Sequence, residues 1–255
     1  MQYPRYQIKF PREDLTKAAQ DESHFTISTN GQEHSIGFHE YSKIYSYRGL
    51  YEQLYYERLQ CNSPETVTRL LHHAATKAGE ASSRFRVLDF GAGNGMVGEL
   101  LVQQGSARVV GIDIIEEAAT AAQRDRPGFY DAYYVGDITQ FSEDKKEELR
   151  QWNFNALTTV AALGFGDIPV HAFSEAYNLL TDNGWVAFNI KEQFLDSSDN
   201  SGFSQLIRKM MYKDYLKIHH IERYCHRLSI EGRKLYYYAI VARKRRDIDS
   251  VILDN

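Results

Sequence analysis

The segment VLDFGAGNG, residues 87–95, constrains this chain more than any other part of the sequence. A short hydrophobic run leads into three glycines, and the amphipathic run MVGELLVQ follows directly. Glycines between a strand and a helix leave backbone N–H groups uncovered by Cβ atoms, and the helix dipole attracts anionic ligand groups to that end. We therefore expect an α/β fold that binds a nucleotide-like ligand at this turn.

The glycines alone do not identify the ligand. Gly93, Gly95 and Gly98 also satisfy the GxGxxG pattern that is typical of dinucleotide-binding proteins. An NAD-dependent oxidoreductase therefore stays open as an alternative at this point.

Three aspartates at the ends of predicted strands distinguish the ligand classes. Asp89 lies two residues before Gly91, where a pyrophosphate would be repelled and a ligand with an ammonium and a sulfonium group attracted. Asp113 ends the next strand, which is the position of a carboxylate that accepts ribose hydroxyls. Asp137 ends the third strand, where it can accept from an adenine amine with Ile138 against the ring. The three carboxylates are expected to meet in one crevice.

Short β-prone runs alternate with amphipathic segments from residue 85 onward. The expected strands cover residues 85–90, 107–113, 131–137, 154–160 and 184–190. The expected helices cover residues 96–104, 115–124, 142–151 and 170–180. Two final runs, 219–230 and 235–243, are joined by too few residues for a parallel crossover, so they are expected to pair antiparallel. The alternation predicts a doubly wound, seven-stranded, mostly parallel sheet with an antiparallel last strand.

The chain of 255 residues is expected to form a single domain. Its expected parts are an N-terminal helical lid or extension over 1–62, a cofactor-binding core over 84–192, a helical insertion over 193–217 and a closing strand pair over 218–243.

The N-terminal part contains three local signals. Asn30-Gly31 predicts a hairpin turn. A tyrosine-rich stripe over 39–59 predicts a helix that is broken near Gly49. Ser63 as N-cap and the proline that follows it predict the start of a helix that ends at residue 78.

The motifs resemble those of class I S-adenosylmethionine-dependent methyltransferases of the small-molecule type. VLDFGAGNG resembles the first motif of that family, VVGIDI (109–114) the second and YVGDI (134–138) the third. The resemblance covers about residues 85–192. It implies a Rossmann-like fold, a transferase activity and S-adenosyl-L-methionine as the cofactor.

The resemblance also implies which residues bind the cofactor. Gly91, Gly93 and Gly95 would surround its methionine part, with Asp89 near the amino group. The ribose and adenine would lie at the second and third motifs. The complete set of expected cofactor-binding residues is Asp89, Gly91, Ala92, Gly93, Gly95, Asp113, Ile114, Gly136, Asp137, Ile138, Val160 and Ala161.

The acceptor side carries a weaker signal. Residues 158–169 read TTVAALGFGDIP, without the Asn/Asp-Pro-Pro-aromatic motif of enzymes that methylate nucleic-acid bases or glutamine amides. This segment resembles the small-molecule branch, which implies that Leu163 and Phe165 lie in a loop over the reactive methyl group. The tyrosine-rich helix resembles the lid of that branch, and a tyrosine ring attracts a cation. The expected substrate and lid residues are His39, Tyr41, Tyr45, Leu163 and Phe165. A purely structural packing role for the tyrosines stays open.

His171 is the candidate catalytic base, because imidazole has a pKa suited to proton abstraction near neutral pH. His39 is a second candidate. No metal site is expected, since His219 and His220 are neighbours on a predicted strand and point to opposite faces.

Charge and hydropathy bear on partners. The net charge of −4 disfavours a nucleic-acid partner, and the basic run 243–246 is interpreted as a solvated chain end. No segment approaches the roughly 18 consecutive apolar residues of a membrane helix, and the N-terminus lacks a signal-peptide core. We expect a cytoplasmic protein without a membrane partner, and the oligomeric state stays open.

The sequence therefore predicts an S-adenosylmethionine-dependent methyltransferase. It is expected to move a methyl group to an O or N atom of a small organic acceptor by in-line displacement. The alternatives are a methyltransferase acting on protein or RNA, an NAD-dependent oxidoreductase and a non-catalytic cofactor-binding protein.

Overall fold

The computed structural model of the chain describes residues 3–11, 24–29, 31–163, 168–192 and 202–249. Its core is a seven-stranded sheet with the order β6-β5-β4-β7-β8-β10-β9. The strands are β4 (Arg86–Phe90), β5 (Arg108–Asp113), β6 (Ala132–Val135), β7 (Ala156–Thr159), β8 (Trp185–Lys191), β9 (Leu216–Leu228) and β10 (Lys234–Lys244). Strand β10 runs antiparallel to β8 and β9, whereas the other neighbouring pairs are parallel. The predicted mostly parallel sheet with an antiparallel last strand is confirmed.

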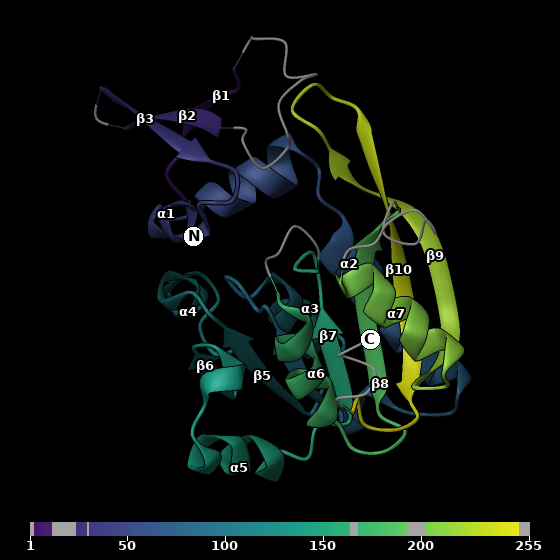
Figure 1. Cartoon of the computed structure of the whole chain (residues 1–255). Helices are drawn as coiled ribbons and strands as arrows, with labels where there is room; N and C mark the ends of the chain where they lie inside the picture. The colour runs from purple at the N-terminus through teal and green to yellow at the C-terminus, as the bar shows by residue number, and fades with distance from the viewer. Residues whose placement is uncertain (1–2, 12–23, 30, 164–167, 193–201, 250–255) are drawn as a thin grey trace.

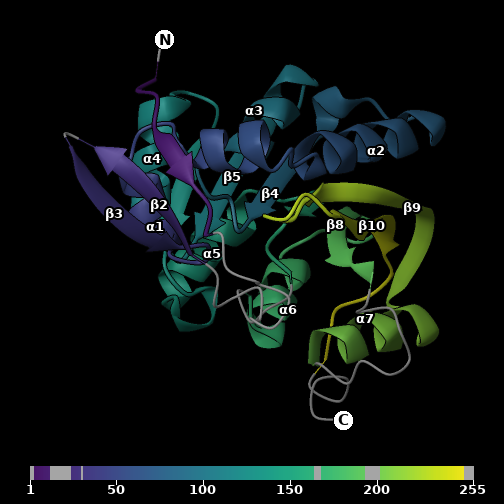
Figure 2. The same cartoon turned by 90° about the horizontal axis from the view of Figure 1, so that it is seen from above.

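Helices cover both faces of this sheet (Figure 2). One face carries α2 (Ser63–Lys77), α3 (Met96–Gln103) and α4 (Glu116–Asp125), and the other carries α5 (Glu143–Gln151), α6 (Val170–Asn178) and α7 (Gly202–Tyr212). Short 3₁₀ turns lie at η3 (Ser82–Arg84) and η4 (Ile138–Gln140). A buried apolar layer fills each side, with Leu88 and Phe188 on the α6 side and Val87 and Trp185 on the α2 side.

The order of the strands indicates at which edge of the sheet a ligand binds. From β4 the chain builds outward through β5 to β6 and then returns to β7 on the other side of β4. The carboxyl ends of β4 and β7 therefore lie at the point where the direction of winding reverses. Open α/β sheets bind ligands in the crevice at this point.

The N-terminal extension has its own small sheet and core (Figure 1). It consists of the antiparallel strands β1 (Gln7–Lys9), β2 (His24–Thr29) and β3 (Gln32–Gly37), followed by helix α1 (Tyr41–Ser46) and the π-helix η2 (Glu52–Arg58). Phe25, Ile27 and Ile36 pack against Ile44 and Leu54 in a cluster separate from the main core. Strand β1 had no clear signal in the sequence.

Two predicted features of the extension are observed. Gly31 has a φ of +79° between β2 and β3, as a tight hairpin needs, while Asn30 lies outside the described residues. The tyrosine-rich helix is interrupted at Gly49, which has a φ of +73°. A Cβ atom there would lie 2.7 Å from the side chain of Tyr3, so both backbone conformation and space require glycine.

Two local predictions are wrong. Ser63 is the first residue of α2 and not its N-cap, which is Asn62. Its hydroxyl instead lies 2.7 Å from the hydroxyl of Tyr224 on β9. The predicted insertion helix ends early, because α7 stops at Tyr212 and β9 already begins at Leu216.

The prediction of a solvated end at residues 243–246 is wrong for Arg243 and Lys244, which are buried, whereas Arg245 and Arg246 are exposed. The guanidinium of Arg243 stacks 3.7 Å from the centre of the Trp185 ring, and Lys244 is 1% exposed and donates to the carbonyl of Leu180 at 2.6 Å. Arg245 pairs with Asp214, and Arg246 stacks on the ring of Tyr215. Arg243 and Lys244 end β10, the other two arginines follow it, and all four cations make contacts within the protein.

Candidate cofactor and acceptor site

A cavity of about 350 Å³ lies between the glycine-rich turn and the N-terminal extension. The predicted cofactor residues that line it are Gly91, Ala92, Gly93, Asp113, Ile114, Gly136, Asp137, Ile138, Val160 and Ala161. The predicted lid residues His39, Tyr41 and Tyr45 line it as well. The structure thus brings together segments from the ends of four strands and from the extension.

The glycine turn after β4 follows a path open mainly to glycine. Gly91, Gly93 and Gly95 have φ values of +76°, +54° and +88°. A Cβ atom on Gly93 would lie 2.7 Å from the hydroxyl of Tyr45, which comes from the extension. The turn therefore needs glycine for its backbone conformation and, at Gly93, for the close approach of Tyr45.

Asp113 links β5 to the glycine turn. Its Oδ2 accepts from the N–H of Gly93 at 2.8 Å and its Oδ1 from the N–H of Ile115 at 2.9 Å. Burial raises the pKa of this carboxyl, while the hydrogen bonds from these two amides oppose the rise. Each oxygen keeps a second lone pair, so the carboxylate can also accept from the hydroxyls of a ribose.

Asp89 lies behind the cavity and not in its wall. It is 1% exposed, and its two oxygens accept from the hydroxyls of Tyr130 and Thr158 at 2.7 and 2.8 Å. Burial raises its pKa to about 6. The ring of Tyr130 also lies 3.1 Å from the position of a Cβ atom on Gly95, the N-cap of α3. Neither Asp89 nor Gly95 lines the cavity, and Tyr130 packs against both of them behind the turn.

Asp137 shapes the turn after β6. Its Oδ1 accepts from the N–H and the hydroxyl of Thr139 at 2.9 and 2.8 Å, which caps the 3₁₀ turn η4. Ile138 is 2% exposed and lies in the same cavity wall. An acidic and an apolar side chain therefore stand next to each other, as an adenine ring with its exocyclic amine requires.

Tyrosines of the extension form the opposite wall. The rings of Tyr45 and Tyr51 lie 5.1 Å apart, those of Tyr51 and Tyr55 4.6 Å apart, and Tyr41 lies next to Tyr45 at 6.2 Å. Tyr41, Tyr45, Tyr51 and Tyr56 line the cavity. Burial raises the pKa of Tyr45 and of Tyr51 well above the ordinary value, so both hydroxyls stay neutral.

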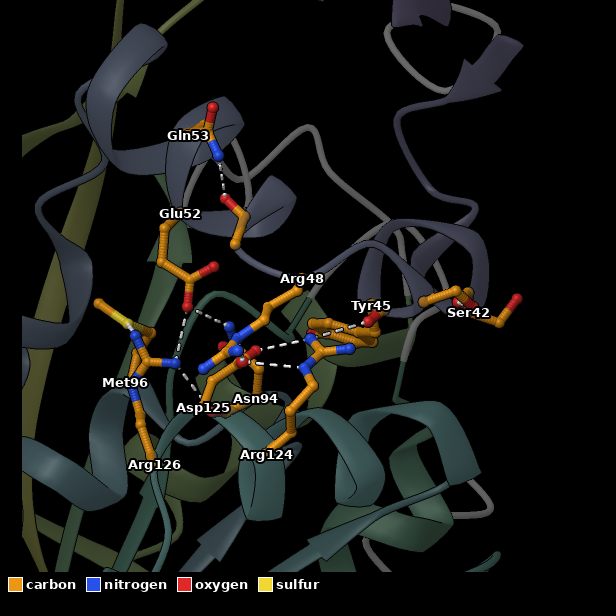
Figure 3. A network of polar contacts seen from close by, with 12 residues as sticks. Ser42, Tyr45, Arg48, Glu52, Gln53, Asn94, Met96, Arg124, Asp125 and Arg126 are labelled. Atoms are coloured by element: carbon orange, nitrogen blue, oxygen red, sulfur yellow. Dashed lines mark hydrogen bonds and ion pairs between the residues drawn. The ribbon is translucent and has the colours of Figure 1, made fainter. Parts of the chain in front are cut away.

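Charged side chains join the extension to the core (Figure 3). Arg126 is 7% exposed and donates to Glu52 at 2.7 Å, to Glu99 at 2.9 Å and to the carbonyl of Asn94 at 3.1 Å. Asn94 also donates to Glu52 at 2.8 Å. Beside this group, Arg124 donates to the carbonyl of Tyr45 at 3.2 Å. The π-helix η2 is therefore attached to the core at two places, just before α3 through Asn94 and just after α4 through Arg126.

Several predicted site residues lie elsewhere. Leu163 is buried in the main core, and His171 is exposed on α6; neither lines the cavity. Phe165 lies outside the described residues.

Other cavity-lining residues were not predicted as site residues. They include Tyr51, Tyr56, Asn94, Ile115 and Ala162. The stripe spacing in 39–59 could have identified Tyr51, and the glycine motif itself could have identified Asn94. Ile115 and Ala162 carry no signal beyond their place next to a predicted residue.

The cavity wall is acidic. Its acidic side chains are Asp113 and Asp137, and none of its described lining residues is Lys or Arg. The sulfonium and ammonium groups of S-adenosylmethionine would be attracted to these carboxylates. The residues present therefore fit S-adenosylmethionine.

Comparison with known proteins agrees with this assignment. Residues 88–188 match the family model described as a methyltransferase domain. A proposed RNA methyltransferase from Pyrococcus horikoshii has a similar fold, with 14% identity, 73% of this chain and 85% of that chain covered, and a TM-score of 0.52. Magnesium protoporphyrin IX methyltransferase from Synechocystis, solved with bound S-adenosylmethionine, is 16% identical, with 71% of this chain and 79% of that chain covered and a TM-score of 0.49. The comparison with curated protein sequences found no match.

The family match and the fold define a methyltransferase domain over residues 88–188, with the architecture of class I S-adenosylmethionine-dependent methyltransferases. The chain is therefore an enzyme, and the residues that line its cavity fit S-adenosyl-L-methionine as the cofactor. Within the part of the chain that the structure describes, no helix is both long and apolar enough to cross a membrane. The same described residues contain no group of three or more His, Cys, Asp or Glu that could hold a metal ion.

Proposed function

We propose that the enzyme transfers the methyl group to an O or N atom of a small organic acceptor. The observation that carries this proposal is the position of Tyr41, Tyr45 and Tyr51, which line the same cavity as the glycine turn. A neutral aromatic wall opposite the cofactor residues suits a flat organic molecule. The acceptor would lie between this wall and the turn after β7.

The chain's own residues would act mainly by positioning. The cofactor, when bound, supplies a methyl group on a positively charged sulfur. Tyr41 and Tyr45 line the cavity, where an aromatic ring would attract such a cation, and the extension would keep water away from it. Holding two reactants in line can contribute roughly 7–11 kcal/mol of the barrier. No further catalytic group is needed unless the acceptor must lose a proton.

His39 is the proposed proton acceptor for acceptors that must be deprotonated. It is half-buried, lines the cavity, and its Nδ1 lies 3.5 Å from the hydroxyl of Tyr41. His171 would have to reach the cavity from the exposed side of α6. We therefore place the proton-accepting role on His39 in preference to His171.

The charge distribution favours a small acceptor over RNA. RNA binding depends on cationic side chains that neutralise phosphates. The four cations of 243–246 pair or stack with residues of this chain, and the described cavity wall has no Lys or Arg. These observations support a small-molecule acceptor and weigh against RNA.

A labelling experiment tests the proposal. The purified enzyme is incubated with S-adenosylmethionine labelled in the methyl group and with a cell extract separated into small-molecule, RNA and protein fractions. We expect label in the small-molecule fraction, with a rate reduced at least about tenfold by Tyr51→Leu. Tyr212→Ala, at a residue 91% exposed on α7, is the control that should change nothing. Label in RNA or protein alone would overturn the proposed acceptor class.

A further inference from the structure

We infer that Asn189 on β8 is a positioning residue that holds the turn after β7 against the glycine turn. The side chain of Asn189 does not line the cavity, and it is fully buried. It acts on the cavity through the backbone of Ala161, which does line it. The inference rests on the cofactor assignment and is independent of the acceptor.

Ala161 has an unusual backbone conformation. Its φ is +56°, in the left-handed region that residues with a Cβ atom rarely adopt. Such a conformation persists only where surrounding contacts impose it, and it is concentrated at functional sites. The N–H of Ala161 donates to Oδ1 of Asn189 at 2.7 Å, which is the contact that imposes it here.

The turn at Ala161 contacts the glycine turn directly. A Cβ atom on Gly91 would lie 2.9 Å from the Cβ of Ala162, the next residue in the turn. Val160 and Ala162 line the cavity on either side of Ala161. A change in the backbone conformation of Ala161 would therefore shift Ala162, which packs against Gly91.

A buried polar cluster fixes the orientation of the Asn189 amide. Its Nδ2 donates to the hydroxyls of Tyr224 at 2.9 Å and Ser63 at 3.2 Å. The Ser63 hydroxyl in turn lies 2.5 Å from Nδ1 of His226. These residues come from β9 and from the first turn of α2, and all are buried.

The N–H of Ala161 can only donate, so Oδ1 of Asn189 faces it and Nδ2 is left to donate to the hydroxyls of Tyr224 and Ser63. Burial lowers the pKa of His226 well below its ordinary value, so its ring is neutral. The hydrogen bonds are then satisfied when Ser63 donates to Nδ1 of His226 and Tyr224 donates to Ser63. The buried cluster thus holds Asn189 with Oδ1 toward the cavity wall.

Binding of S-adenosylhomocysteine, measured by calorimetry, tests the inference without an acceptor. Asn189→Leu removes the acceptor for the N–H of Ala161, and we expect the dissociation constant to rise about tenfold. Adding Ala161→Gly to this variant should restore the dissociation constant to within about threefold of the wild type, because glycine adopts the left-handed conformation without support. Tyr177→Phe is the matched control, since it removes one buried hydroxyl bond, to the carbonyl of Tyr215, away from the cavity.

The double variant separates positioning from general destabilisation. A purely structural role for Asn189 predicts that Ala161→Gly does not restore binding and that Tyr177→Phe weakens it equally; either result overturns the inference. Unchanged binding by folded Asn189→Leu also overturns it. If Asn189→Leu does not fold, Asn189→Ser gives the same comparison with a smaller polar side chain. Failure of the wild type to bind the ligand would instead contradict the cofactor assignment.

Discussion

The N–H of Gly93 donates to Oδ2 of Asp113 at 2.8 Å, so the carboxylate that faces the cavity also holds the glycine turn in place. Ligand contact and loop geometry therefore depend on the same side chain. The two roles can be separated by substitution with asparagine. Its side-chain amide has a shape similar to that of the carboxylate, but it is uncharged and has one acceptor oxygen instead of two.

Asp113→Ala should weaken S-adenosylhomocysteine binding about 100-fold. It removes the hydrogen bonds to the two ribose hydroxyls, which contribute about 1.5 kcal/mol each to binding, and it also removes the two bonds that hold the turn. Asp113→Asn keeps one acceptor oxygen and should fall between this variant and the wild type. Calorimetry gives the three dissociation constants. Asp182→Ala, at an exposed aspartate, is the control, and equal binding by all four proteins would contradict the proposed contact.

Gly93→Ala should reduce binding of the same ligand at least about tenfold, because its Cβ would meet the hydroxyl of Tyr45 and its backbone would be strained. Gly128→Ala provides a matched control, since Gly128 also has a positive φ, of +81°, but a Cβ there would meet nothing within 4 Å. Adding Tyr45→Phe to Gly93→Ala removes the oxygen that clashes and should recover part of the loss. No recovery would mean that the strain of the backbone alone determines the effect.

Glu52→Ala should lower the free energy of unfolding by about 3 kcal/mol, since it leaves the buried guanidinium of Arg126 without one of its carboxylates. Glu57→Ala removes an exposed ion pair with Arg5 from the same π-helix and should cost less than about 1 kcal/mol. Denaturant titration measures both values. Similar losses for the two variants would show that the buried pair does not attach the extension.

Asp89→Asn should change the pH dependence of stability. The folded-state pKa of Asp89 is raised to about 6, so its contribution is present in full below about pH 4 and is lost as the pH rises to about 6. The variant cannot ionise and should gain up to about 3 kcal/mol relative to the wild type between pH 4 and pH 7. Denaturant titrations at several pH values test this. Asp182→Asn should show no such trend, and a constant difference for Asp89→Asn would refute the raised pKa.

The sheet and the cofactor cavity could be predicted because their signals are local in the chain. The run at 87–95 combines strand, glycines and helix start within nine residues, and the strand ends at Asp113 and Asp137 follow at the spacing of βα units. Hydrophobic periodicity determines such elements with little help from distant contacts. The predicted seven-stranded, mostly parallel sheet with an antiparallel last strand and the predicted methyltransferase domain are confirmed for the same reason.

The partners of individual polar groups could not be predicted in this way. Asp89 accepts a hydrogen bond from Tyr130, which is 41 residues away in the sequence, and Ser63 is hydrogen-bonded to Tyr224, which is 161 residues away. Lys244 is part of a run of four cations, but its strand carries it into the core beside the carbonyl of Leu180. In each case a tertiary contact determines the hydrogen-bond partner of the side chain, and the spacing of residues along the chain does not predict that contact.

The attachment of Glu52 to Arg126 has a consequence for the order of assembly. The ribosome releases Glu52 first, and its counter-ion follows only 74 residues later. The tyrosine wall of the cavity therefore cannot be held by this ion pair until helix α4 has been made. Attachment of the extension by this pair must wait for synthesis of the first two strands of the sheet, β4 and β5, which precede Arg126.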